Sequence, residues 1–235
     1  MIENIEELLY ANPYPGRGIL IGRSEDGKRG IIVYFIMGRS ENSRNRIFER
    51  TFGGIRTTAR DETKVTNPEL IIYHPVRTVD EQVIVTNGDQ TDTIANHLKE
   101  GYSFLEALHT REFEPDAPNY TPRISALVQP SGSYVLSILK TLAGNPNHCQ
   151  RSFFDYSSAI PGLGHFISTY ETDGNPLPSF EGEPIPVQIN DTGGLEQFAL
   201  NIWNALNSNN KVSLYARETN YITGEINDLI VNKHA

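Results

Sequence analysis

The sequence predicts an α+β protein in which one β-sheet is stacked on another and helices lie on the outside. Three observations indicate this class: strand patterns that follow one another as hairpins, an unbroken apolar run at residues 31–37, and an amphipathic helix at residues 195–206. Consecutive hairpins build antiparallel sheets, and a strand that is apolar on both faces must be covered on both. Helices with one apolar stripe then cover the outer faces. No shift in composition divides the chain, so we expect one domain over residues 1–235.

The first half of the chain reads mainly as strands. A short helix at residues 3–11 ends at the Pro- and Gly-containing segment 12–16. The turn Glu25-Asp26-Gly27-Lys28 contains Asp-Gly between two apolar runs, which is a strong hairpin signal. The predicted strands here cover residues 18–22, 30–37, 47–58 with a bend at 53–54, 70–73, and 82–86 after a turn at Asp80.

The second half begins with two predicted helices. One runs from Thr91 to a glycine cap at Gly101. The next starts at Ser103, where Glu106 completes a capping box. Residues 173–186 hold six prolines or glycines and little apolar material, so we expect a surface excursion. The remaining predicted strands cover residues 123–129, 134–142, 151–156, 165–170, 211–218 and 226–231.

Composition excludes several classes of function. The formal net charge is −9, which disfavours non-specific binding to nucleic acid or anionic membranes. The single cysteine, Cys149, rules out an intrachain disulfide, and the six histidines lack the spacing of a zinc site. The first residues are acidic, unlike a secretory signal, and no apolar stretch reaches the ~18 residues of a membrane span. We therefore expect a cytoplasmic protein without a metal.

Arginines concentrate in one part of the chain. Nine of fourteen fall between Arg17 and Arg60, and the densest stretch directly follows the apolar run 31–37. There, Arg39 and Arg46 are interleaved with small hydroxyl and amide side chains, including Ser40 and Asn45. Guanidinium groups bind phosphate through paired hydrogen bonds, so this stretch predicts a phosphate site. The alternative is a solvated loop with surface ion pairs.

Two further segments carry candidate binding groups. Residues 87–94 lie at a strand-to-helix junction, where free backbone amides and a glycine turn suit an anion. Ordinary helix capping is the simpler alternative. Arg123 stands at the start of an apolar strand, where a charge must be paired or contact a ligand.

Taken together, these segments resemble one family, the archaeal-type IMP cyclohydrolases. The resemblance rests on motifs in the same order along the chain: 18–23, Arg39-Ser40 with Asn45-Arg46, Asn87-Gly88 with 91–94, 121–124 and 168–171. The chain departs from the family by extra residues near 1–16, 53–64 and 173–186. The resemblance implies a four-layer αββα sandwich like that of N-terminal-nucleophile hydrolases, but without the N-terminal nucleophile.

The resemblance also implies a reaction and a set of site residues. The reaction closes the ring of 5-formamidoimidazole-4-carboxamide ribonucleotide (FAICAR) to give IMP with loss of water. It requires no cofactor, and its small-molecule partner is a purine ribonucleotide monophosphate; a homo-oligomer is consistent with the family. The implied catalytic residues are Tyr73, Glu114 and Arg46. The implied substrate-binding residues are Arg23, Arg39, Ser40, Asn45, Asn87, Gly88, Thr91, Asp92, Thr93 and Arg123.

Two alternatives stay open from the sequence. The chain could be a nucleotide-binding protein that kept the pocket and lost the chemistry. It could also be an amidohydrolase of the parent fold, although no Cys, Ser or Thr opens the chain. Glu114 and Tyr73 beside intact phosphate donors favour the enzyme.

Overall fold

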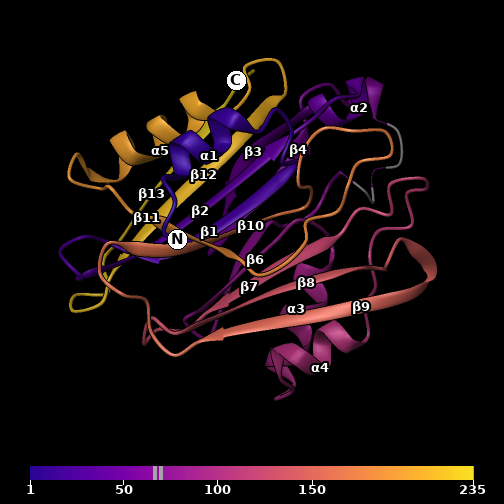
Figure 1. Ribbon diagram of the computed structural model, residues 1–235. Helices are drawn as coiled ribbons and strands as arrows, with labels where there is room; N and C mark the ends of the chain where they lie inside the picture. The colour runs from indigo at the N-terminus through magenta and orange to yellow at the C-terminus, as the bar shows by residue number, and fades with distance from the viewer. Residues whose placement is uncertain (66–67, 69–70, 235) are drawn as a thin grey trace.

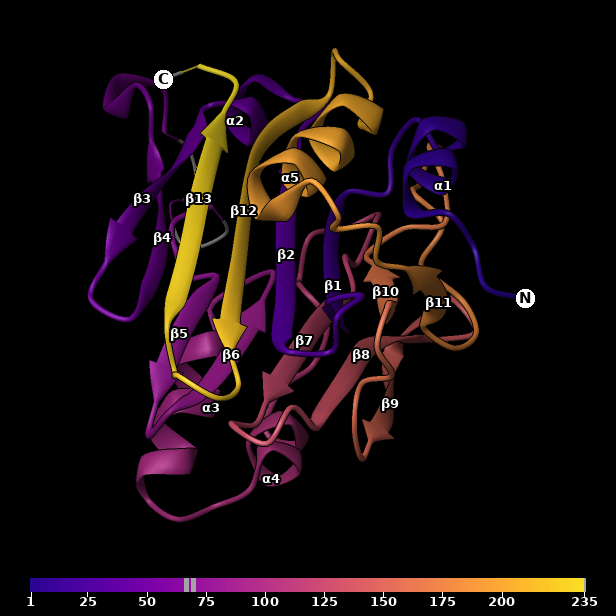
Figure 2. The ribbon, with the colours of Figure 1, turned by 90° about the vertical axis from the view of Figure 1, so that its left-hand side faces the viewer.

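A computed structural model describes residues 1–65, 68 and 71–234. Within these residues the strands form two sheets in which all neighbouring strands are antiparallel (Figures 1 and 2). The first sheet contains, in spatial order, β11 Ile185–Gln188, β10 Leu163–Ser168, β1 Arg17–Arg23, β2 Arg29–Met37, β12 Lys211–Asn220 and β13 Ile226–Asn232. The second contains β3 Arg46–Thr51, β4 Gly54–Ala59, β5 Val76–Val79, β6 Gln82–Thr86, β7 Arg123–Val128, β8 Tyr134–Leu142 and β9 Asn145–Tyr156.

The inner faces of the two sheets share one apolar core. Alternate residues of β2, namely Ile32, Tyr34 and Ile36, pack in this core with side chains from the second sheet, such as Val85 of β6 and Ile124 of β7. The predicted strand at 30–37 is thus confirmed, and it is buried on both faces as expected. An α+β fold with two stacked antiparallel sheets follows from this core.

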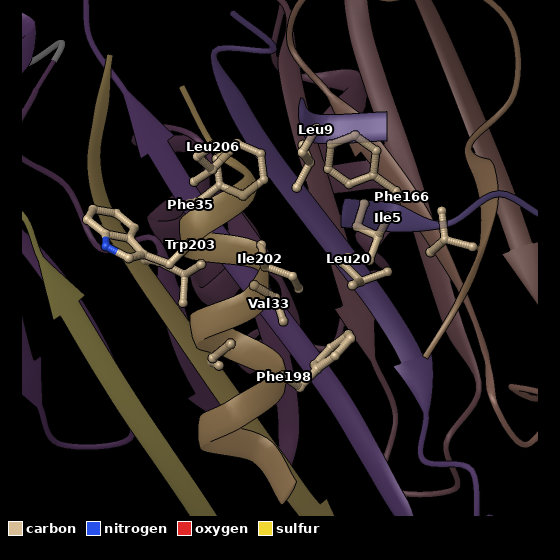
Figure 3. Close-up of a cluster of buried hydrophobic side chains, with 14 of the residues drawn as sticks. Ile5, Leu9, Leu20, Val33, Phe35, Phe166, Phe198, Ile202, Trp203 and Leu206 are labelled. Carbon is tan, nitrogen blue, oxygen red and sulfur yellow. The ribbon is translucent and has the colours of Figure 1, made fainter. Parts of the chain in front are cut away.

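Helices lie on the outer faces of both sheets. The first sheet carries α1 Ile5–Ala11 and α5 Gly194–Ala205, whose apolar side chains meet Val33 and Phe35 of β2 (Figure 3). The second sheet carries α3 Gln90–Lys99 and α4 Phe104–His109, which pack on side chains of β6, β7 and β8. Two short helices, α2 Glu41–Arg44 and the 3₁₀ helix η1 Glu62–Lys64, lie next to the hairpin of β3 and β4 in sequence. No helix in the described ranges is long and apolar enough to span a membrane.

Local signals placed most elements correctly. The capping box of Ser103 and Glu106 starts α4, and Gly101 takes the left-handed conformation after α3 with φ +84°. The bend predicted at 53–54 falls at the β3–β4 hairpin, where Phe52 and Gly53 form the turn and Gly54 begins β4. Asp80 and Glu81 both have positive φ, as a two-residue hairpin turn between β5 and β6 requires.

The predicted strand at 70–73 is wrong. Leu70 falls outside the described residues, and residues 71–73 are not in a strand; the strand in this part of the chain is β5. The amides of Ile71 and Ile72 donate to the carbonyl of Pro68, which closes a turn. Tyr73 instead bonds to Thr57, through its amide at 2.8 Å and its carbonyl at 2.9 Å. Apolar side chains are therefore buried here without a strand ladder.

The expected surface excursion at 173–186 is also only partly correct. Leu177 and Phe180 are buried, and Ile185 begins the edge strand β11. A few apolar side chains suffice to fold this Pro- and Gly-rich segment back onto the protein. This matters for the site, because Leu177 lines the main polar pocket described next.

Candidate functional site

The main candidate site is a pocket at the end of the β1–β2 hairpin opposite its turn. Because the strands are antiparallel, the start of β1 at Arg17 faces the end of β2 at Ile36. A cavity of ≈ 270 Å³ opens there. Its lining residues are Tyr14, Arg17, Met37, Arg39, Ser40, Asn42, Ser43, Arg46, Ile71, Glu114, Asp116, Asn119, Thr121, Tyr170 and Leu177.

Two arginines, the nearly buried Arg17 and the buried Arg46, dominate the charge of this pocket. Burial opposes the charged form of Arg17, but the neighbouring Glu114 and the phenol of Tyr170 raise its pKa well above the usual value. Burial and then the nearby charge of Arg17 lower the pKa of Arg46. Among the described residues, three buried guanidinium nitrogens have no hydrogen-bond partner: Arg17 Nε and Arg46 Nη1 in the pocket, and Arg123 Nε beside it. Such N–H groups can bind an anionic or carbonyl oxygen of a ligand.

Arg46 is held in place by backbone carbonyls. Its Nε donates to the carbonyl of Ser43 at 2.8 Å, and its Nη2 donates to that of Met37 at 3.1 Å. Its exposed fraction is 1%, so the guanidinium has no freedom to turn towards solvent. This arrangement leaves Nη1 as the donor that remains for a ligand.

Glu114 supplies the carboxylate of the pocket. Its amide donates to the carbonyl of Thr121 at 2.9 Å, which fixes the loop before β7. Burial raises the pKa of Glu114, while the charges of Arg17 and Arg123 oppose this shift. A carboxyl group with a raised pKa holds a proton more readily than an exposed one, which suits it to proton transfer.

Tyr73 lies close to the two arginines, although it is not one of the residues that line the cavity. Its phenol is among the groups that act to raise the pKa of Arg17 and of Arg46. Its hydroxyl is hydrogen-bonded to that of Tyr34 at 2.8 Å, in the core between the sheets. Tyr73 is therefore buried beside the pocket and does not line it.

Arg39 and Ser40 lie on the more exposed side of the pocket. Arg39 forms an ion pair with Asp173, donates to the carbonyl of Gly174 at 2.9 Å, and lies 5.0 Å over the ring of Tyr14. Ser40 caps α2 by accepting from the amide of Ser43. Both predicted phosphate-binding residues thus share one pocket with Arg46.

The predicted corner at residues 87–93 is tightly bonded to itself and lies next to the pocket. Arg123 donates to Gln90 at 2.6 Å and pairs with Asp89 at 2.7 Å, so its charge is already matched. Asn87 lies 3.5 Å from Oε1 of Glu114 and donates to the carbonyl of Pro122. The corner therefore contacts Glu114 through the side-chain amide of Asn87 and does not line the pocket itself.

The other residues predicted in this corner have local partners. The Thr91 hydroxyl bonds to Thr86 at 2.5 Å and to the carbonyl of Gly88, and the Asp92 carboxylate pairs with Arg77. The Thr93 hydroxyl accepts from Arg111. At Gly88 an added Cβ would lie 2.6 Å from Arg123 Nη1, so glycine permits the close approach of that side chain.

Two predicted site residues lie away from the pocket. Asn45 exchanges two hydrogen bonds with the backbone of Asp61, at 2.7 and 2.8 Å. Arg23 stands at the other end of β1 from Arg17, about 20 Å away for six residues of strand, where it lies over the ring of Tyr221.

Three pocket residues carry chemistry that the sequence interpretation did not assign: Arg17, Asp116 and Tyr170. Arg17 had a usable signal, because it opens an apolar strand just as Arg123 does. As for metals, the described residues contain no group of three or more His, Cys, Asp or Glu side chains that could hold an ion.

The fold and this pocket together define an α+β protein with a buried, positively charged site suited to a small anionic ligand. Comparison with known proteins gives the family: residues 14–224 match the family of IMP cyclohydrolase-like proteins. The chain belongs to this family.

Individual relatives from three archaea carry the name of the same family. An IMP cyclohydrolase from Methanosphaera stadtmanae is 30% identical over 162 residues, covering 67% of this chain and 74% of the relative. One from Haloquadratum walsbyi is 30% identical over 190 residues, covering 79% and 81%. One from Methanopyrus kandleri is 37% identical over 118 residues, covering 48% and 58%.

Proposed function

We propose that this protein closes the ring of FAICAR to form IMP, with loss of water. The observation that carries the proposal is the meeting, in one buried pocket, of a carboxyl group with a raised pKa and a guanidinium N–H without a partner: Glu114 and Arg46. Ring closure needs a group that moves protons and a donor at the oxygen where charge develops. The names of the relatives support the same reaction.

The chemistry divides between these two residues. As the carboxamide nitrogen attacks the formyl carbon, a new C–N bond forms and the carbonyl electrons move onto the formyl oxygen. Glu114 accepts the proton released by that nitrogen, and Arg46 Nη1 stabilises the negative oxygen. The formyl oxygen then leaves as water, having gained one proton from the carboxamide nitrogen and one from the formamide nitrogen. The hydroxyl of Tyr73, which is hydrogen-bonded to that of Tyr34, lies near Arg17 and Arg46 during this step.

Binding of the ribonucleotide uses the more exposed side of the pocket. Arg39 provides donors for the phosphate, Ser40 lies beside it with its hydroxyl donating to Ser43 Oγ at 3.0 Å in the ligand-free pocket, and Arg17 adds positive charge on the inner wall. The 87–93 corner acts indirectly, since Asn87 lies against the carboxylate of Glu114.

We extend the proposal to the architecture. The two sheets and their outer helices correspond to the αββα layers of the N-terminal-nucleophile hydrolases, and residues 1–235 act as one domain. Support comes from the single core between the sheets and from helices on both outer faces.

The direct test is an activity assay. Purified protein mixed with FAICAR is expected to produce an ultraviolet absorbance change as the purine ring forms, with a product whose mass is lower by one water. Tight IMP binding without any turnover of FAICAR would instead identify a nucleotide-binding protein.

A further inference from the structure

Three hydrogen-bonded side chains form a chain along one wall of the pocket. The hydroxyl of Tyr170 lies 2.6 Å from that of Thr121, which in turn lies 2.5 Å from Oδ2 of Asp116. All three residues line the cavity, and the ring-closing steps proposed above use none of them.

The direction of these hydrogen bonds follows from the number of protons. A carboxylate can only accept, and Asp116 also accepts the backbone amide of Thr121 through Oδ1 at 2.7 Å. The hydroxyl of Thr121 has one proton and must donate it to Asp116. Tyr170 must then donate its own proton to Thr121, so its oxygen has only lone pairs left for the pocket.

Tyr170 is rigid enough for this direction to matter. Its exposed fraction is 2%, and its ring stacks on that of Tyr14 with centroids 5.9 Å apart. On another side Gly16 approaches so closely that an added Cβ would lie 2.5 Å from Cδ2 of the ring. The phenol oxygen is thus a fixed acceptor at one point of the pocket.

We propose that Tyr170 selects ligands carrying an N–H at the nitrogen that becomes N1 of the purine, and that Thr121 and Asp116 are positioning residues that fix its acceptor direction. This inference rests on the proposed function. The carboxamide nitrogen of FAICAR and N1 of IMP both carry hydrogen, whereas N1 of AMP carries only a lone pair. The lone pairs of Tyr170 and of AMP would face each other without a proton between them.

The test compares IMP and AMP binding by calorimetry in wild type and in variants of the chain. In Asp116→Asn, Oδ1 still accepts the Thr121 amide, so the new NH₂ group takes the place of Oδ2 and donates to Thr121. All the bonds reverse, and Tyr170 then donates into the pocket. We expect the ratio of IMP affinity to AMP affinity to fall by about 10- to 100-fold.

Two changes at Thr121 provide a matched pair. Thr121→Val has nearly the same shape but frees the Tyr170 hydroxyl to turn, so the ratio should fall by about tenfold. Thr121→Ser keeps the hydroxyl and should keep the ratio. Comparing ratios cancels the other difference between the ligands, the 6-oxo and 6-amino groups. Melting temperatures establish that each variant is folded. If Asp116→Asn does not fold, the comparison of Thr121→Val with Thr121→Ser still tests the inference.

Two results would overturn the inference. One is a ratio that stays within about twofold of wild type in both Asp116→Asn and Thr121→Val. Another is wild-type protein that binds AMP as tightly as IMP. Turnover of FAICAR by the same wild-type preparation separates this inference from the proposed function. Turnover with an unchanged ratio overturns only this inference, whereas absence of turnover overturns the proposed function as well.

Discussion

A guanidinium nitrogen of Arg17 lies 3.7 Å from Oε2 of Glu114, and both side chains are almost entirely buried. Arg46 adds a second cation to the same pocket and Arg39 a third, more exposed one, so the lining carries three arginines against the two carboxyl groups of Glu114 and Asp116. Buried charges without partners are costly, and an anionic ligand would complete the balance. The carboxylate is held between cations yet keeps a raised pKa, because burial outweighs their attraction.

Replacing Glu114 tests its role in proton transfer. Glu114→Gln keeps the shape but cannot accept a proton, so kcat for FAICAR should fall by about 10²–10⁴-fold. Affinity for IMP, measured by calorimetry, should change little. Glu112→Gln is a matched control, since Glu112 lies exposed on the same loop. Wild-type turnover by Glu114→Gln would remove Glu114 from the mechanism.

The raised pKa of Glu114 also predicts how stability depends on pH. The folded protein holds this proton more tightly than the unfolded chain, so the resulting stabilisation is fully present below the usual carboxyl pKa. It is lost as pH rises through the raised folded-state pKa. Glu114→Gln has no such proton. The melting temperature of Glu114→Gln minus that of wild type should therefore increase from about pH 4 to about pH 8. A difference that is constant or shrinks would contradict the shift.

Much of the fold could be predicted because its signals are local. The apolar run of β2, the capping box of Ser103 and the apolar stripe of α5 each act over a few residues. The strand predicted at 70–73 failed because apolar residues there are buried by a turn and by bonds to Thr57, which lies 16 residues away from Tyr73. No local pattern reports such a partner.

The site could be predicted only where the elements themselves place a residue. Arg39 and Arg46 were identified because they follow β2 directly in sequence. Arg23 was assigned through a motif, yet the predicted β1–β2 hairpin puts it beside the turn and puts Arg17 beside the end of β2. Leu177 lines the pocket and Asp173 pairs with Arg39, although both lie more than 130 residues beyond Arg39 in the chain. Contacts at that separation require the whole fold.

Arg39 is expected to contribute binding energy for the phosphate. Arg39→Ala should weaken IMP binding by about tenfold, at the low end for a charged hydrogen bond because Arg39 already pairs with Asp173. Arg23→Ala removes an arginine from the far end of β1 and should leave the affinity unchanged. Equal losses in the two variants, measured by calorimetry, would show that the phosphate is not bound at Arg39.

Arg46 is expected to act on the transition state more than on the bound product. Two backbone carbonyls hold its Nε and Nη2, which leaves Nη1 as the donor towards the oxygen that becomes negative. Lysine keeps the charge but has one nitrogen, which cannot serve both carbonyls and the pocket with the same geometry. Arg46→Lys should therefore lower kcat by about 10²–10³-fold, the usual effect of removing one such donor.

Arg44→Lys is the matched control: Arg44 belongs to α2 just before Arg46, but its guanidinium bonds to Gly38 and Asn210. If single-turnover assays gave Arg46→Lys the same rate as Arg44→Lys, the oxygen charge would have to be stabilised by another group, and Arg17 Nε would be the next donor to examine.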